Sequence, residues 1–245
     1  YSSDPDERES QVKSDLYKSI VSKDTSLRPS VETNIHNLIR YSYGVHTHPS
    51  LINGFLCINH AKEVYHELFR DVAIFVEYTD PGYTLFKKIE KLIRDYRARK
   101  SMDPKMIMLR NHGIFVSADS VEEIEKLYGM VIKALKTRIS KKIPEGKRAV
   151  DKKTTEILPG IRSVISQESL KVLKIRNNAL ISHFVNDPEL FQAIRGPFTP
   201  DIIVYCKSAY IFIDLDKNTP VEKYLSHFKD KYQRYLTERK HQPKV

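Results

Sequence analysis

The chain has 245 residues, of which 40% are hydrophobic and 29% charged, proportions that are ordinary for a globular protein. This length is enough for one large domain or two modest ones with a buried core. No apolar run approaches the roughly 20 residues that span a membrane, and no signal peptide is recognisable, so we expect a cytoplasmic protein without membrane partners. Neither cysteine, Cys57 or Cys206, shows metal or redox spacing, which favours a reducing compartment.

The net charge of +10 raises the hypothesis of a nucleic-acid-binding protein. Much of the excess lies in residues 133–142, in the second half of an expected amphipathic helix, and continues to Lys153. No aromatic residues alternate with these lysines and arginines, and no nucleic-acid motif is present. We therefore interpret the basic segment as a solvated helix face and expect no nucleic-acid partner.

Residues 1–145 alternate between helical and strand patterns. Apolar residues at helical spacing predict helices, and short continuous apolar runs predict strands that are buried on both faces. This alternation is typical of a layered α/β domain. The predicted helices cover 4–22, the stretch after Ser30, 49–69, 83–99 and 120–141, and the predicted strands end at His48 or cover 72–76, 106–109 and 114–116.

Residues 146–245 differ from the first part of the chain in their pattern of apolar and polar residues. A linker at 144–148, which contains proline and glycine, separates the two parts. Residues 170–175 alternate between apolar and polar, and 202–205 and 210–213 are apolar and rich in β-branched or aromatic residues, which predicts strands. A charged helix is expected over 219–240. We therefore predict a second, smaller α/β subdomain over 146–245, after a first domain over 1–145.

A His-Thr-His-Pro segment ends the first predicted strand. His46 and His48 lie two residues apart, so in a strand both side chains point to the same face. His112 follows the strand at 106–109, and Gly113 removes side-chain bulk beside it. If adjacent parallel strands brought these ends together, the three imidazoles would form a zinc site with an open position. The alternative for His112 alone is a buried, hydrogen-bonded histidine in a turn.

Glu32 is the candidate catalytic carboxylate. It is expected in the first turn of a helix capped by Ser30, where a carboxylate is stabilised by the helix dipole. Near a divalent cation it could act as a general base or as a displaceable fourth ligand. The alternative is that the Glu32 carboxylate only stabilises the helix dipole. His36, four residues later, shares the same helix face and is a candidate for supporting the site.

Three segments together resemble the class II aldolase/adducin family. They are Arg28-Pro-Ser-Val-Glu32, His46-Thr-His48-Pro49 and Arg110-Asn-His112-Gly113-Ile-Phe-Val116. The resemblance covers roughly residues 25–142 and implies a three-layer α-β-α domain. The segment Gly196-Pro-Phe-Thr-Pro-Asp201, with the residues after it, resembles the branch that includes bifunctional rhamnulose-1-phosphate aldolase/alcohol dehydrogenases. The dehydrogenase part is not expected here, because the sequence has no Gly-x-Gly-x-x-Gly.

Carried over by resemblance, His46, His48 and His112 match the zinc ligands of the family, although another divalent metal is an alternative. Glu32 matches its catalytic glutamate, and Ser30 matches a serine that holds the substrate phosphate. Val31 stands where the family has a second serine. The glycine-rich phosphate loop that precedes this region in the family does not occur in this sequence. The chain also begins with Tyr1, so we expect a portion of a longer polypeptide.

The resemblance implies a zinc-dependent lyase that cleaves a rhamnulose- or fuculose-phosphate-like ketose-1-phosphate through an enediolate. It also implies a homo-oligomer, expected to be a tetramer. Two alternatives remain open. One is an epimerase or decarboxylase of the same superfamily, which would use the same metal ligands. The other is a non-catalytic module like the adducin head domain, which lacks the metal histidines.

Overall fold

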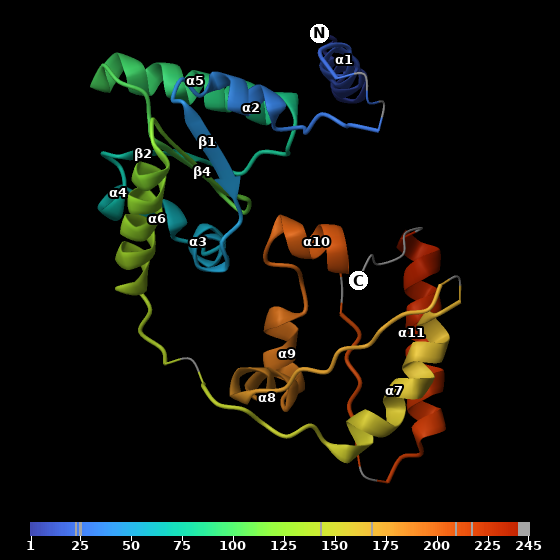
Figure 1. Cartoon of the computed structure of the whole chain (residues 1–245). Coiled ribbons are helices and arrows are strands. Elements are labelled where there is room, and N and C mark those ends of the chain that lie inside the picture. The colour runs from blue at the N-terminus through green and yellow to red at the C-terminus, as the bar shows by residue number, and fades with distance from the viewer. Residues whose placement is uncertain are drawn as a thin grey trace. The chain divides into compact units, whose positions relative to one another are not determined.

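The structure, a computed structural model, describes residues 1–239 except for positions 23, 25, 143, 168, 209 and 217. The chain divides into two units, Tyr1–Ile139 and Ser140–Val245, which are described separately. Figure 1 follows both from the N-terminus in blue to the C-terminal helix in red.

The N-terminal unit is built on a four-stranded sheet with the order β1-β4-β3-β2. Its strands are β1 (Tyr43–Thr47), β2 (Ala73–Val76), β3 (Met106–Leu109) and β4 (Gly113–Ala118), so every strand predicted in this part of the chain is present. β2 and β3 are parallel, whereas β4 runs antiparallel to both β3 and β1. The expectation that parallel strands place the histidines together was therefore wrong. β3 and β4 form a hairpin, because Asn111 adopts a left-handed conformation (φ 58°) that reverses the chain.

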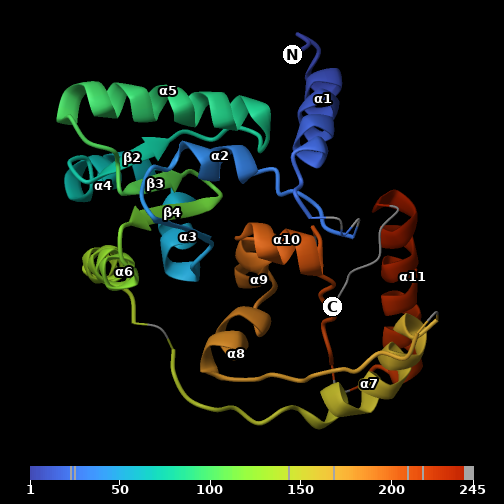
Figure 2. The same cartoon turned by 45° about the horizontal axis from the view of Figure 1, so that its top comes forward.

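Helices cover both faces of this sheet and give three layers (Figures 1 and 2). One face packs against α3 (Ser50–Leu56), α4 (Ala61–Leu68) and α6 (Val121–Lys136), and the other against α2 (Thr33–Leu38) and α5 (Tyr83–Lys100). Strands β2, β3 and β4 are buried along their whole length, as expected for strands covered on both faces. The predicted α-β-α layering of the first domain is thus confirmed.

Helix boundaries differ from the prediction in three places. The single helix expected over 49–69 is two helices, α3 and α4. The carbonyl oxygen of Leu56, at the end of α3, accepts a hydrogen bond from the backbone N–H of Asn111 (3.3 Å), so a contact far along the chain competes with helix continuation. Helix α2 begins at Thr33, not in the turn after Ser30, and α6 ends at Lys136. The first helix, α1 (Pro5–Lys18), falls within the predicted range.

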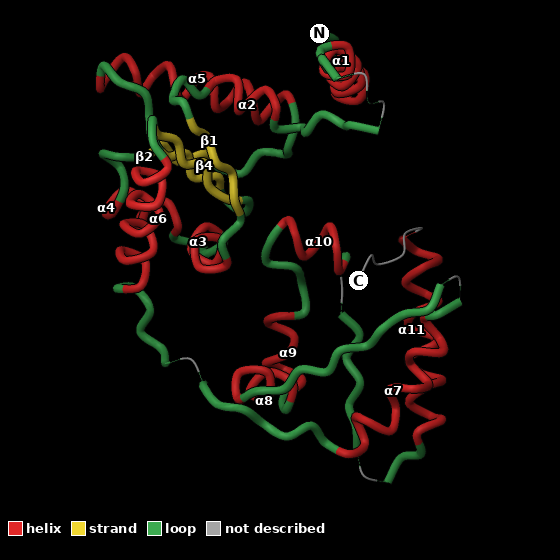
Figure 3. The backbone as a smooth tube through the Cα atoms, in the orientation of Figure 1, coloured by secondary structure: helices red, strands yellow, loops and turns green. Residues whose placement is uncertain are grey.

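The described residues of the C-terminal unit contain helices but no β-strand (Figure 3). The strand predictions in this unit were wrong: 170–175 and 210–213 form no regular element, and 202–205 lie in a helix. The helix at 202–205 begins with Pro200, and the Thr199 side chain caps it by accepting a hydrogen bond from the N–H of Ile202. These helix-start signals outweigh the strand preference of the β-branched residues that follow. The helices are α7 (Lys152–Ile165), α8 (Ala179–Val185), α9 (Pro188–Ile194), α10 (Pro200–Cys206) and α11 (Val221–Arg239).

Helices α7 and α11 pack closely against each other in this unit. A Cβ atom on Gly160 of α7 would lie 2.3 Å from Cδ1 of Leu225 in α11, so the glycine permits the close approach. Helix α11 matches the charged helix predicted at the end of the chain. Among the residues that the structure describes, no helix is long and apolar enough to cross a membrane.

Candidate metal centre

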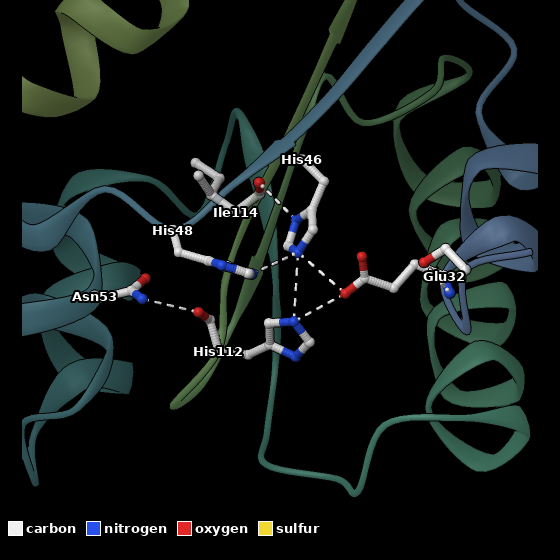
Figure 4. A network of polar contacts seen from close by, with 7 residues as sticks. Glu32, His46, His48, Asn53, His112 and Ile114 are labelled. Atoms are coloured by element: carbon white, nitrogen blue, oxygen red, sulfur yellow. Dashed lines mark hydrogen bonds and ion pairs between the residues drawn. The ribbon is translucent and has the colours of Figure 1, made fainter. Parts of the chain in front are cut away.

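Four side chains that are distant in sequence converge at one end of the sheet (Figure 4). One ligand atom each from Glu32, His46, His48 and His112 lies within 4.8 Å of the other three. Nε2 of His46 is 3.0 Å from Nε2 of His48 and 3.3 Å from Nε2 of His112. Oε1 of Glu32 is 3.1 Å from Nε2 of His46 and 2.9 Å from Nε2 of His112. All three histidines and the carboxylate singled out in the sequence therefore meet.

Antiparallel pairing of β1 and β4 brings the histidines together. In this register His46 lies opposite Phe115 and Thr47 opposite Ile114, so the end of β1 reaches the beginning of β4. His48 follows directly after β1, and His112 directly precedes β4. The shared end of the two strands therefore presents all three imidazoles.

Gly113 is required by this arrangement. A Cβ atom at this position would lie 2.6 Å from Cδ2 of His48, 2.7 Å from the carbonyl oxygen of Thr47 and 3.1 Å from Cε1 of His46. Such distances are far below ordinary contact, and one of the neighbours is backbone. The absence of a side chain thus allows two of the histidine rings to lie against β4.

The orientation of His46 is set by two groups on β4. Nδ1 of His46 donates a hydrogen bond to the carbonyl oxygen of Ile114 (3.1 Å), and the ring stacks on Phe115 with centroids 4.0 Å apart and 17° between the planes. Because a carbonyl oxygen can only accept, Nδ1 carries the hydrogen and Nε2 of the neutral ring presents a lone pair. This is the usual arrangement for a histidine that binds a metal.

His112 is held through its backbone. The side-chain amide of Asn53, a 1% exposed residue of α3, donates a hydrogen bond to the carbonyl oxygen of His112 (2.9 Å). The left-handed Asn111 turns the chain immediately before it. Helix α3 and the β3–β4 turn together therefore fix the position from which His112 reaches the cluster.

Glu32 reaches the cluster from the start of α2. It is the N-cap residue of that helix, but its side chain makes no capping bond and points instead to the histidines. Burial tends to raise the pKa of the Glu32 carboxyl, yet its contacts with the imidazoles of His112 and His46 outweigh this and hold the pKa well below its usual range. Glu32 is therefore ionised at neutral pH. A general base that works near neutral pH would instead be expected to have a raised pKa. This geometry fits the fourth-ligand interpretation.

The donor set fits a divalent metal of the zinc type. In a tetrahedral zinc site with Zn–N bonds of about 2.0–2.1 Å, neighbouring ligand atoms lie about 3.3 Å apart. The four distances from Nε2 of His46 and Oε1 of Glu32 are 2.9–3.3 Å, which is close to this spacing. Imidazole lone pairs and an ionised carboxylate this close together repel one another unless a positive charge lies between them. A zinc ion held by His46, His48, His112 and Glu32 would supply it.

The remaining predicted residues lie around this centre. Oγ of Ser30 accepts a hydrogen bond from the backbone N–H of Glu32 (3.1 Å), so it shapes the turn that presents Glu32, and its predicted contact with a phosphate stays a prediction. His36 packs edge-on against Phe115, with centroids 5.2 Å apart, and so reaches His46 through that ring. Cys57 and Cys206 form no disulfide.

Three residues that support the cluster were not predicted from the sequence. Asn53 contacts His112 and Phe115 contacts His46. Oη of Tyr128 in α6 lies 2.6 Å from Oγ1 of Thr47, the residue between His46 and His48. Asn53 lies in a stretch of apolar residues, which is the one local signal for a buried polar group with a partner. The other two are ordinary core residues by pattern.

Two sequence families match the chain. Residues 6–139 match the Class II Aldolase and Adducin N-terminal domain, and residues 152–245 match Aldolase class II, second domain. The chain therefore belongs to the class II aldolase/adducin family, as the three sequence segments indicate.

A curated relative and two solved structures are similar to parts of the chain. The relative is a protein of Bacillus subtilis (strain 168) named uncharacterized oxidoreductase YuxG, 25% identical over 233 residues, which cover 86% of this chain and 33% of that protein. The chain thus spans about a third of the length of this relative. The N-terminal class II aldolase domain of a conserved protein from Thermoplasma acidophilum is 22% identical, with a TM-score of 0.44 over 53% of this chain and 57% of that one. An aldolase II superfamily protein from Pseudomonas syringae is 17% identical, with a TM-score of 0.38 over 49% of each chain.

Proposed function

We propose that this protein is a zinc-dependent class II aldolase-type lyase that cleaves a ketose-1-phosphate. The observation that carries the proposal is the convergence of His46, His48, His112 and Glu32 at metal-ligand spacing. Membership of the class II aldolase/adducin family supports it. The non-catalytic, adducin-like alternative is disfavoured, because a pure binding module has no need for three imidazoles and a carboxylate at this spacing.

Each residue has a separate task in such a reaction. The three histidines lie on or next to β1, β4 and the hairpin turn, and they would serve as the fixed ligands. The side chain of Glu32 is 19% exposed, compared with 7% for His46 and 12% for His112. Glu32 is thus more accessible to the substrate than these two histidines, and its carboxylate can both yield to the substrate and exchange a proton with it.

The proposed chemistry is a reversible aldol cleavage. The C3–C4 bond of the ketose breaks, its electron pair remains on the C3 fragment as an enediolate, and the C4 hydroxyl loses its proton to give an aldehyde. A divalent cation at the cluster would supply Lewis-acid stabilisation of the negative charge that develops on the ketone oxygen. The carboxylate of Glu32, the form favoured at neutral pH, would accept the proton of the C4 hydroxyl, deliver a proton to C3 of the enediolate and so return to the carboxylate.

The substrate class and the assembly are further parts of the proposal. We propose that a rhamnulose- or fuculose-phosphate-like sugar is the partner and that the hydroxyl of Ser30, two residues before Glu32, contacts its phosphate. We also propose a homo-oligomer, expected to be a tetramer, in the cytoplasm. Size-exclusion chromatography with light scattering tests the assembly, with four chains per particle as the expected result.

A cleavage assay tests the proposed reaction. The full chain loaded with zinc is incubated with rhamnulose-1-phosphate and with fuculose-1-phosphate, and dihydroxyacetone phosphate is measured through its reduction by a coupling enzyme. Release of this product by the wild type, lost in His48→Ala and strongly reduced in Glu32→Gln, is expected. Conversion of the sugar phosphate to a stereoisomer without cleavage would instead identify an epimerase, and no turnover of either sugar by metal-loaded protein would contradict the lyase.

A further inference from the structure

The side chain of Phe115 lies between two histidines in the interior of the N-terminal unit. Phe115 is in the middle of β4, 1% exposed, directly opposite His46 in the strand register. Its ring stacks on the imidazole of His46 with centroids 4.0 Å apart and an angle of 17° between the planes. The ring of His36 meets it edge-on, at 5.2 Å and 67°.

The stack determines where Nε2 of His46 points. The χ2 torsion of histidine has broad preferences, so the side-chain torsions alone do not define the plane of the imidazole. The hydrogen bond from Nδ1 to the carbonyl oxygen of Ile114 fixes one atom of the ring but permits rotation about that contact. A nearly parallel aromatic face against the imidazole removes this freedom, so that Nε2 faces the other two histidines.

The same ring also connects β4 to helix α2. His36 lies in this helix, and its backbone N–H donates a hydrogen bond to the carbonyl oxygen of Glu32 (3.1 Å). Ile35, the buried residue of the helix, belongs to the same core cluster as Phe115. Because Glu32 is the N-cap of this helix, the packing of Phe115 against His36 helps to set the position of the carboxylate.

We propose that Phe115 is a positioning residue of the metal centre, which orients His46 directly and Glu32 through His36 and helix α2. The inference rests on the proposed metal site, and it concerns a residue that itself offers no ligand atom. Replacement of Phe115 by an aliphatic residue is expected to weaken metal binding without removing any of the four ligands. Changes to groups that orient metal ligands typically reduce affinity by about 10- to 100-fold.

The test compares Phe115→Leu with a control of matched size. Phe75→Leu, on β2, removes the same atoms from a 9% exposed ring that packs against Tyr65, two strands away from β4. Full-length proteins are stripped with a chelator and titrated with zinc against a chromophoric competitor, and the visible absorption of the Co²⁺-loaded forms is recorded. Circular dichroism establishes that each variant is folded, and Phe115→Met, which retains more volume, replaces the leucine variant if that one does not fold.

Weaker zinc binding by about 10- to 100-fold and an altered cobalt spectrum in the Phe115 variant, with both unchanged in Phe75→Leu, are the expected results. If the Phe115 and Phe75 variants bind zinc equally well and give the same cobalt spectrum as the wild type, the positioning role is wrong, although the metal site stands. If the wild type itself binds neither ion, the proposed function fails first, and the positioning role fails with it.

Discussion

Gly113 leaves a space that the ring of His48 occupies: a Cβ atom on this glycine would lie 2.6 Å from Cδ2 of His48. The same atom would meet the carbonyl oxygen of Thr47 at 2.7 Å, and this backbone atom cannot move aside without distorting β1. The close approach links β1 and β4, at whose shared end the histidines lie. The proposed metal centre therefore depends on the absence of a side chain at Gly113.

Gly113→Ala should therefore damage the metal centre more than the fold. We expect zinc affinity to fall by at least about tenfold, because His48 is displaced, and the free energy of unfolding to fall by about 1–3 kcal/mol from overpacking. Zinc titration and urea unfolding measure the two effects. Gly129→Ala is the control: this exposed helical glycine has nothing within 4 Å of an added Cβ, and alanine there should stabilise the protein by about 0.5–1 kcal/mol. Equal zinc affinity in the two variants would refute the role of Gly113.

Asn53→Ala tests the support of His112. The substitution leaves the carbonyl oxygen of His112 without its hydrogen bond from the Asn53 amide, in a buried environment. We expect a loss of about 1–3 kcal/mol in the free energy of unfolding, together with weaker zinc binding. Asn59→Ala, at an exposed position of the segment between α3 and α4, serves as the control and should change neither. A neutral effect of Asn53→Ala on both quantities would show that this hydrogen bond does not hold His112.

Tyr128→Phe removes the hydroxyl that lies 2.6 Å from Oγ1 of Thr47. This pair joins α6 to β1 on the face opposite His46, so its loss should lower the free energy of unfolding by about 1 kcal/mol. The number of zinc ions bound should not change, because the ligands are untouched. Tyr78→Phe is a suitable comparison, because that hydroxyl contacts Asp80 at an exposed turn and should contribute little. Thermal unfolding of both variants decides; an unaltered melting temperature in Tyr128→Phe would contradict the prediction.

Glu77 should make stability depend on pH in the acid range. Burial tends to raise the pKa of this carboxyl, but hydrogen bonds and ion pairs with Lys62 and Arg110, each at 3.1 Å, lower it below its ordinary value of 4.5. Because the pKa is lower in the folded protein, the contribution is complete above pH 4.5 and is lost as the pH falls below that value. Urea unfolding at a series of pH values should give a shallower acid loss for Glu77→Gln than for the wild type. Identical pH profiles would exclude this contribution. Salt at 1 M should reduce the difference between the two pH profiles, because these side chains are partly exposed.

Much of the proposed metal centre could be predicted from local sequence patterns. The two-residue periodicity of a strand places His46 and His48 on one face, and the Asn-His-Gly segment identifies His112 at a hairpin turn. These features are short-range, so the residues alone reveal them. The antiparallel register that joins them is a long-range property, and the sequence pattern was equally compatible with parallel neighbours.

The supporting residues and the second unit could not be predicted in the same way. Phe115 and Tyr128 have the pattern of ordinary core residues, and their roles depend on which strand or helix packs opposite. The break between α3 and α4 depends on a backbone contact between Leu56 and Asn111, which are 55 positions apart. In α10, a favourable helix start at Thr199 and Pro200 outweighs the strand preference of the residues that follow.

Metal analysis of the purified chain tests the central claim most directly. Inductively coupled plasma mass spectrometry should find about one zinc ion per chain in the wild type, as expected for a single four-ligand site. It should find almost none in His48→Ala, provided that circular dichroism shows the variant to be folded. A folded wild type that retains no divalent metal, even after incubation with zinc and removal of the excess, would contradict the account.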